Sequence, residues 1–141
     1  MIKFLDIYKQ DKKIIKLINK DLQRIIKKNN FILGEDVDKF ERNFSNFCGS
    51  KYAIGCANGT DALTIALKSL NLKRNSEVLM PAMTYCSTAF AVIDAGLKPV
   101  LVDTDYLSPT INLNELKKKI NRKTKVIIPV HLYGSVADIF K

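Results

Sequence analysis

The sequence lacks the long apolar segments of a membrane protein, and its opening does not read as a secretory signal. None of its apolar runs approaches the roughly 18 residues that cross a bilayer. Its opening, MIKFLDIYKQDKK, contains no uninterrupted apolar stretch and no small-residue cleavage site. We therefore expect a soluble protein that does not have a membrane as its partner.

Cysteine and histidine are scarce. Cys48, Cys56 and Cys86 are odd in number and show no CxxC spacing, which argues against a disulfide framework and against a zinc site. This usage fits a reducing, cytoplasmic setting best. His131 is the one histidine, and a single histidine is more often a hydrogen-bonded structural group than a catalyst.

The glycine-rich loops that bind nucleotides are absent as well. Neither GxxxxGK[ST] nor GxGxxG occurs, and the glycines around Gly55 and Gly59 are too few and in the wrong register for either loop. The sequence therefore does not indicate a nucleoside triphosphatase or a nicotinamide enzyme.

Acidic residues are outnumbered by basic ones. The 23 Lys and Arg residues against 14 Asp and Glu residues give a formal charge of +9, which can attract phosphates, nucleic acid or an anionic membrane. No long block of like charge occurs, because Ile and Asn are interspersed among the basic residues. A general lean of the composition toward Lys, Ile and Asn explains the charge, so nucleic acid is not an expected partner. RNA binding by the basic helix expected over 9–28 stays an alternative.

Apolar periodicity indicates that this basic helix is followed by a second one over 36–47. Phe40, Phe44 and Phe47 share one side of the second helix, and we expect them in the core rather than in a cofactor pocket. Gly49 is expected to end the helix as a C-terminal glycine.

From residue 49 onward, predicted strands and helices alternate. The strands are expected at 52–57, 77–81, 99–103 and 125–130, and the helices between them at 60–70, 87–95 and 114–121. PVLVD and KVIIPV are nearly continuous apolar runs, as in parallel strands that are covered on both faces. The alternation predicts an α/β protein with a parallel sheet. Because the chain stops at HLYGSVADIFK, soon after a predicted strand, we expect the domain to be incomplete.

Ligands of such sheets bind outside the carboxyl ends of the strands, where loops lead into helices. At the first loop, Gly59 leaves the backbone unhindered and Thr60 offers a hydroxyl, while free N–H groups and the helix dipole favour a phosphate. An ordinary cap, with Asn58 or Thr60 accepting from the next turn, explains the same residues. Asp61 slightly favours the cap, because its charge already satisfies that helix end. The local residues leave both interpretations open.

The later strand ends carry further candidates. Tyr85 follows the second predicted strand and could stack on a flat heteroaromatic ligand, although a structural tyrosine is more common. Cys86 has no base beside it in the sequence, so we do not expect a nucleophile there. Asp103 and Asp105 are spaced like a metal pair, but a capping or turn role fits them as well, and we expect no metal site. His131 follows the fourth predicted strand.

Taken together, the phrases at these strand ends resemble one family. The phrases are FILGEDVDKFERNFSNFCGSKYAIGCANGTDALTIALKSL, EVLMPAMTYCSTAFAVIDAGLKPVLVDTD and TKVIIPVHLYGSVADI. They closely resemble the amino-terminal part of the DegT/DnrJ-type sugar aminotransferases, which are pyridoxal-phosphate enzymes of fold type I. The opening IKFLDIYKQ resembles the usual start of that family. The resemblance covers nearly the whole chain in order, so it is far more specific than any single motif.

The resemblance implies that residues 1–141 are the amino-terminal part of a three-layer large domain with a mostly parallel, seven-stranded sheet. Within them, 1–48 would be a helical segment and 49–141 the alternating β/α part. It further implies a homodimer with active sites at its interface. The reaction would transfer an amino group, usually from glutamate, to a keto sugar attached to a nucleotide, with pyridoxal 5'-phosphate as the cofactor.

The resemblance also implies roles for individual residues. Gly59 and Thr60 correspond to the pair that holds the cofactor phosphate, and Tyr85 corresponds to the aromatic residue that stacks on the pyridine ring. Three further residues are implied near the substrate or in the wall of the site: Gly34, His131 and Tyr133.

No catalytic residue is expected among these 141. The aspartate that pairs with the pyridine nitrogen and the lysine that bonds the cofactor covalently are both expected downstream, and Lys141 is not in a matching context. The chain by itself should therefore be inactive as a transaminase. Two alternatives stay open: a relative with His in place of the lysine that performs dehydration, and a non-catalytic module that binds a phosphate or a nucleotide.

Overall fold

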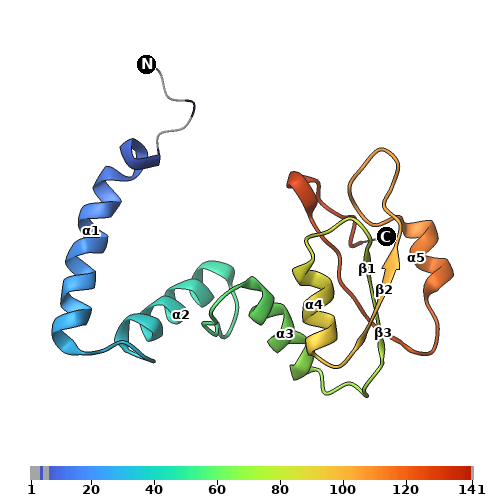
Figure 1. Ribbon diagram of the computed structural model, residues 1–141, viewed down its shortest axis with the longest axis horizontal. Helices are drawn as coiled ribbons and strands as arrows, with labels where there is room; N and C mark the ends of the chain where they lie inside the picture. The colour runs from blue at the N-terminus through green and yellow to red at the C-terminus, as the bar shows by residue number, and fades with distance from the viewer. Residues whose placement is uncertain (1–3, 5–6, 141) are drawn as a thin grey trace. The chain divides into compact units, whose positions relative to one another are not determined.

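Two compact units make up the chain in the computed structural model, which describes residue 4 and residues 7–140. One unit is Met1–Gly55 and the other is Cys56–Lys141. Figure 1 shows the helices of the first unit in blue to blue-green and the sheet of the second in green to red. The sheet and its loops carry most of the candidate site residues.

The described residues of the first unit form two helices, and an ion pair links the end of one to the start of the other. The helices are α1 (Ile7–Lys28) and α2 (Glu35–Cys48), close to the ranges predicted from the apolar period. The guanidinium of Arg24 lies 2.8 Å from the carboxylate of Asp36 in the first turn of α2. The hydrogen bond from Arg24 is the main cause that holds the pKa of Asp36 below its ordinary value.

The end of α2 follows the prediction, but its aromatic face does not. Gly49 adopts φ 64°, and its N–H donates to the carbonyl of Asn46, so the glycine ends the helix as expected. The rings of Phe40 and Phe44 stack with centroids 5.6 Å apart. However, Phe40, Phe44 and Phe47 are all exposed, so their prediction as core residues is wrong for this unit. The apolar period defines a face, and no described element packs extensively against it.

The second unit is built on a three-stranded parallel sheet with the order β2-β1-β3. Its strands are β1 (Glu77–Pro81), β2 (Lys98–Val102) and β3 (Thr124–Ile127). Its helices are α3 (Gly59–Ser69), α4 (Ser87–Asp94) and α5 (Leu113–Lys119), with the short 3-10 helix η1 (Leu132–Gly134) after β3. Each of these strands and α-helices lies within three residues of its predicted range.

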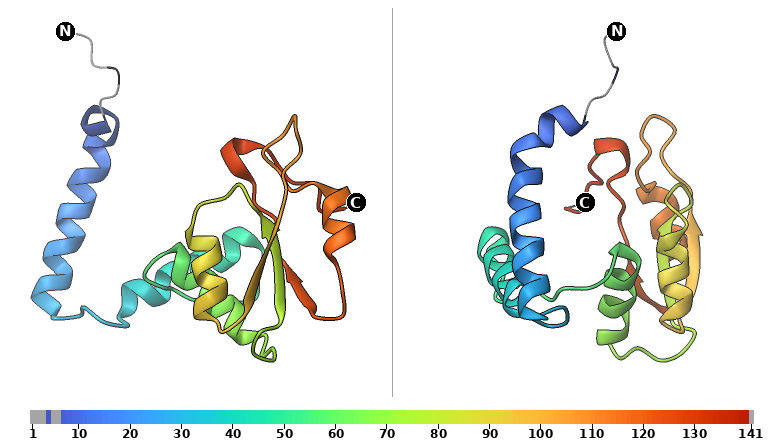
Figure 2. Two further views of the ribbon diagram at one scale, coloured as in Figure 1. Left: turned by 45° about the vertical axis from the view of Figure 1, so that its right-hand side comes forward. Right: turned by 60° about the vertical axis from the view of Figure 1, so that its left-hand side comes forward.

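Hydrophobic clusters cover both faces of the sheet, and β1 lies between them. Successive residues of a strand point to opposite faces. Val78 and Met80 accordingly belong to the cluster with α3 and α4, whereas Leu79 packs with residues of β2 and α5. Figure 2 shows α4 and α5 on opposite sides of the sheet. The α/β fold with helices on both faces of a parallel sheet is therefore confirmed.

The strand predicted at 52–57 is absent from the structure. Tyr52 and Ile54 are exposed, and the backbone of 52–57 is not paired with any described strand. The N–H of Gly55 instead donates to the carboxylate of Glu41, at 2.6 Å. A single extended segment becomes a strand only when a neighbour satisfies its backbone groups. The alternating side chains of 52–57 predict an extended backbone but do not supply that neighbour.

A carboxylate joins the amino ends of all three strands. Glu77, the buried first residue of β1, accepts from Nδ2 of Asn121 at 2.8 Å and from Nζ of Lys98 at 3.1 Å. Lys98 begins β2, and Asn121 lies in the turn before β3. The hydrogen bond from Asn121, followed by that from Lys98, lowers the pKa of Glu77 below its ordinary value.

Replacing Glu77 with Gln should therefore lower the thermal stability in a pH-dependent way. Because the folded pKa is depressed, the stabilisation is present above the unfolded value of about 4.3 and is lost as the pH falls through the folded value. The difference in melting temperature between wild type and E77Q should be largest near neutral pH and should shrink as the pH falls below about 4. Thermal melts from pH 7 to pH 3 measure it. The exposed-carboxylate variant E35Q is the control, and a pH-independent difference for E77Q would contradict the expectation.

Candidate functional site

The first turn of α3 is capped by a side chain and still keeps free donors. Oδ1 of Asn58 accepts from the N–H of Asp61 at 2.9 Å, and Nδ2 of Asn58 donates to the Asp61 carboxylate at 3.0 Å. The cap interpretation is therefore correct for Asn58. The N–H groups of Gly59 and Thr60 have no acceptor among the described residues, and neither has the hydroxyl of Thr60. The cap and an anion site are thus compatible.

The geometry of this turn suits a phosphate. Unpaired N–H groups at a helix start carry the positive end of the helix dipole, which favours an anion. A Cβ added to Gly59 would meet no atom within 4 Å, so the packing of the described chain does not require a glycine there. Its bare Cα instead lets an anion approach the backbone closely. Asp61 adds a negative charge to the same turn, but its carboxylate is engaged with Asn58.

Tyr85 stands in the turn between β1 and α4. The hydroxyls of Thr84 and Thr88 lie 3.0 Å apart, and the N–H of Thr88 donates to the carbonyl of Tyr85, so hydrogen bonds fix the turn. The Tyr85 side chain is 74% exposed and forms no ring contact within the part of the chain that the structure describes. Its ring is therefore available for stacking on a flat heteroaromatic group.

His131 and Tyr133 lie in the loop after β3. Nδ1 of His131 accepts from the N–H of Ala137 at 2.9 Å, which places the proton of the neutral ring on Nε2. The imidazole thus has a structural role in this loop and keeps one nitrogen free of that bond. Tyr133 is exposed and adopts φ 52°, a left-handed conformation that costs energy for a residue with a side chain.

The structure brings most of the predicted site to one end of the sheet. Gly59 and Thr60 begin α3, Tyr85 precedes α4 and His131 precedes η1, and Figure 2 shows these three segment starts at the same end. Tyr85 follows the carboxyl end of β1 and His131 that of β3, as the fold predicts, whereas Gly59 and Thr60 follow the unpaired segment 52–57.

Gly34 belongs to the first unit, where it is the N-cap residue just before α2. The side chain of Asn30 lies 2.6 Å from the position that a Cβ of Gly34 would take. A residue with a Cβ at this position would displace the end of the Asn30 side chain. The predicted approach of Gly34 to a substrate stays a prediction.

The aspartates after β2 form a turn. Oδ1 of Asp105 accepts from the N–H of Tyr106 at 3.1 Å, and the main-chain carbonyl of Asp103 accepts from the N–H of Asn112 at 2.9 Å. No group of three or more potential metal ligands occurs among the described residues. In the same part of the chain, no helix combines the length and apolar character needed to cross a membrane.

Sequence reasoning missed the residues that hold the site loops in place. Thr84 and Thr88 are spaced by four around the start of a predicted helix, and that spacing of two hydroxyls was a usable signal. Ala137 acts through its backbone N–H, for which the sequence carries no signal.

The fold and the site together define an α/β chain that offers free donors at the start of α3 and an exposed aromatic ring before α4. Residues 12–141 match the DegT/DnrJ/EryC1/StrS aminotransferase family, and the chain belongs to this family. The resemblance stated from the sequence is thereby confirmed.

Individual relatives match nearly the whole of this chain over only part of their own length. The dTDP-3-amino-3,6-dideoxy-alpha-D-galactopyranose transaminase of Aneurinibacillus thermoaerophilus is 39% identical over 139 residues, 99% of this chain and 38% of its own length. The chain therefore spans well under half of that relative. A crystal structure of S. venezuelae DesV in complex with a ketimine intermediate superposes with a TM-score of 0.88 at 31% identity, covering 97% of this chain and 37% of DesV.

A third relative carries out a different reaction. The E. coli GDP-4-keto-6-deoxy-D-mannose-3-dehydratase with bound hydrated PLP superposes with a TM-score of 0.74 at 30% identity. The superposition covers 82% of this chain and 31% of the dehydratase chain. Pyridoxal phosphate is thus the cofactor seen in a structural neighbour, and both transaminase and dehydratase chemistry occur among the neighbours.

Proposed function

We propose that the protein transfers an amino group to the keto group of a nucleotide-linked sugar, with pyridoxal phosphate as cofactor. The proposal makes residues 1–141 the amino-terminal part of the large domain, with a helical segment at 1–48 and the alternating part at 49–141. One observation carries it: the start of α3 has free N–H groups at Gly59 and Thr60, and the exposed Tyr85 precedes α4, whose start lies at the same end as that of α3 in Figure 2. Membership of the aminotransferase family supports it.

The residues present fit the cofactor. The N–H groups of Gly59 and Thr60 and the hydroxyl of Thr60 would hold its phosphate, because charge-assisted hydrogen bonds to phosphate are stronger than neutral ones. Tyr85 would stack on the pyridine ring and keep its plane fixed. The bound cofactor supplies an electron sink for amino-group chemistry. In this proposal His131 and Tyr133 form a wall of the site and Gly34 lies along the substrate path, with no chemical step assigned to any of the three.

The reaction proposed for the whole protein is a balanced exchange. Glutamate gives up its amino group and leaves as 2-oxoglutarate, while the keto carbon of the sugar receives the amino group. The proposal includes a homodimer in the cytoplasm as the working form. The catalytic lysine and the aspartate beside the pyridine nitrogen are proposed to lie beyond Lys141, because these 141 residues offer no lysine in a matching context.

Dehydration is the second candidate, because one structural neighbour is a dehydratase with bound hydrated PLP. The two reactions differ in product, since dehydration removes a sugar hydroxyl as water and leaves no amino group on the sugar. The residues described here serve either reaction equally well. A phosphate-binding module without chemistry would need the same Gly59-Thr60 turn and is therefore an outcome of the test.

The experiment uses the protein expressed from the longest reading frame that contains these residues. Purified protein is loaded with pyridoxal phosphate and incubated with 3-keto and 4-keto nucleotide sugars, with and without glutamate, and products are identified by mass spectrometry. We expect an aminated sugar and an equal amount of 2-oxoglutarate, both dependent on glutamate.

Three other outcomes would replace or overturn the proposed function. Loss of a hydroxyl without amination would assign dehydration. Saturable cofactor binding without turnover of any keto sugar would assign a binding module. Absence of the absorbance change that accompanies cofactor binding would overturn the assignment of Gly59, Thr60 and Tyr85 to the cofactor.

A further inference from the structure

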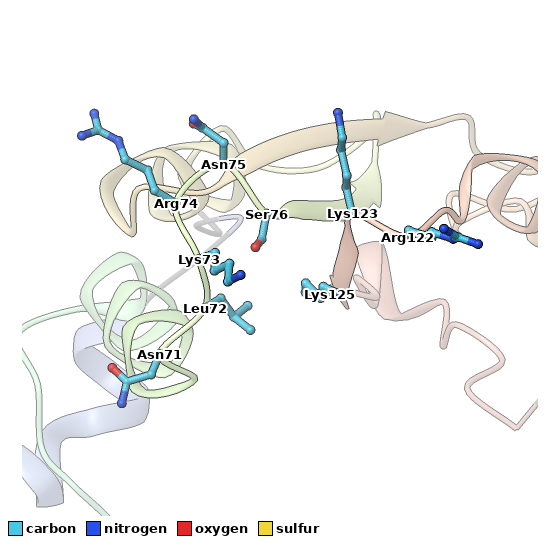
Figure 3. A pocket seen from close by; sticks show the side chains of 9 residues that line it. All are labelled: Asn71, Leu72, Lys73, Arg74, Asn75, Ser76, Arg122, Lys123 and Lys125. Carbon is cyan, nitrogen blue, oxygen red and sulfur yellow. The ribbon is translucent and has the colours of Figure 1, made fainter.

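A basic pocket lies at the amino ends of β1 and β3, the end of the sheet opposite Tyr85 and His131. It is formed by the turn before β1 and by the turn before and the start of β3, and its volume is about 680 Å³. Volumes of this size are common for sites that bind small molecules. Figure 3 shows the residues that line it: Asn71, Leu72, Lys73, Arg74, Asn75, Ser76, Arg122, Lys123 and Lys125.

Backbone hydrogen bonds hold the two turns beside each other. The N–H of Glu77 donates to the carbonyl of Lys123 at 2.8 Å, which ties the start of β1 to the turn before β3. The N–H of Asn75 donates to the carbonyl of Gly96 at 3.0 Å, and that of Ser76 to the carbonyl of Lys73 at 3.0 Å. The cations are thus carried by a backbone that is fixed in place.

Five cationic side chains line this pocket: Lys73, Arg74, Arg122, Lys123 and Lys125. None of them forms an ion pair with a described residue. The nearby carboxylate of Glu77 is hydrogen-bonded to Lys98 and Asn121, and its electrostatic interaction with Lys123 is the weakest of those that lower its pKa.

The negative ends of nearby helices offset only part of this positive charge. The C-termini of α3, α4 and α5 all reach this end of the sheet, since Asn71 follows α3, Gly96 follows α4 and Asn121 follows α5. Each C-terminus carries roughly half a negative charge, so the three together offset about 1.5 of the five positive charges. A surplus of more than three positive charges therefore remains around the pocket.

The side chains frame a space between the two turns. In Figure 3 the side chains of Lys73 and Lys125 lie between the turns, whereas Arg74 and Arg122 point outward at opposite ends. Like charges around one pocket repel one another, so an anion bound among them is stabilised both by attraction and by relief of that repulsion. A single carboxylate would leave most of the surplus in place, but a group with two phosphates would match it.

We propose that this basic pocket binds the pyrophosphate group of a small anion, either free or carried by a nucleotide. Lys73 and Lys125 contact the phosphates from the two turns, while Lys123, Arg74 and Arg122 lie at the rim and attract them electrostatically at longer range. Asn75 and Ser76 supply neutral polar groups, and Leu72 supplies an apolar wall. The site is separate from the Gly59-Thr60 turn and does not depend on the proposed transaminase activity.

The test measures pyrophosphate binding by titration calorimetry at fixed ionic strength, on protein from the longest reading frame with pyridoxal phosphate already bound. The pocket variant is Lys73→Gln/Lys123→Gln/Lys125→Gln. The control variant is Lys12→Gln/Lys16→Gln/Lys117→Gln, which removes the same charge from exposed positions outside the pocket. We expect the pocket variant to raise the dissociation constant at least tenfold and the control variant to change it less than twofold.

Further arms identify the source of the phosphates. Tighter binding of ADP than of pyrophosphate, lost in the same pocket variant, would show that a nucleotide carries the group, and weaker binding of ADP would show that the free anion is preferred. Equal weakening in both variants would overturn the proposal, because net charge alone would explain the binding. Binding of an RNA oligomer without binding of pyrophosphate would also overturn it. Melting temperatures of both variants establish that each is folded.

Discussion

Replacing Thr60 with Val should weaken the binding of pyridoxal phosphate by about 10- to 100-fold. The hydroxyl of Thr60 has no partner among the described residues, so its loss leaves the internal hydrogen bonds of α3 intact. A hydrogen bond to a charged group contributes about 1.5 to 3 kcal/mol, and each 1.4 kcal/mol corresponds to a tenfold change in affinity. Titration of the apoprotein with pyridoxal phosphate, followed by absorbance, measures the change.

A matched control for this prediction lies one turn further along α3. Thr64→Val makes the same chemical change away from the free N–H groups at the helix start and should leave the cofactor affinity within about twofold. Thr60→Val should melt close to wild type, because no described contact is lost. If both variants bind the cofactor as wild type does, the phosphate does not sit at this turn.

Replacing Leu79 with Ala should lower the free energy of unfolding by about 2 to 5 kcal/mol. Leu79 is fully buried at the centre of β1 and packs between residues of β2 and α5. Truncation removes buried methyl groups and leaves a cavity, because strands on both sides prevent the sheet from closing over it. Denaturant unfolding followed by circular dichroism, on protein from the longest reading frame, measures the loss.

The same truncation at an exposed leucine is the comparison. Leu107 is 92% exposed in the loop between β2 and α5, so Leu107→Ala should change the free energy of unfolding by less than about 0.5 kcal/mol. Equal losses for the two variants would show that the packing around β1 differs from the arrangement described here.

The elements of the second unit were predictable because their signals are local. Strands β1, β2 and β3 are short apolar runs, and an asparagine begins each of α3 and α5 as a cap. The parallel sheet followed from the alternation of strands and helices. A local signal also predicted that Gly49 ends the helix of the first unit, and its left-handed conformation does end α2.

The wrong predictions have a common cause. A local pattern of residues predicts a strand or an apolar helix face, but it does not identify the element that pairs with it or packs against it. Residues 52–57 alternate like a strand, but no described strand lies beside them. Phe40, Phe44 and Phe47 form one face of α2, but no described element covers it. At the site, the sequence left the Asn58-Gly59-Thr60 turn open between cap and anion site, because both use the same N–H groups. Only the structure shows that Asn58 takes one donor and leaves others free.

The strand order determines which face of the sheet each connecting helix covers. The chain moves from β1 to β2 in one direction and then returns past β1 to β3 on the other side. Connections between parallel strands are right-handed in nearly all proteins, so reversing the direction of travel moves the connecting helix to the opposite face. The positions of α4 and α5 on the two faces are therefore set by the route of the chain rather than by either helix. Substitutions that keep the apolar positions of these helices should leave that arrangement unchanged.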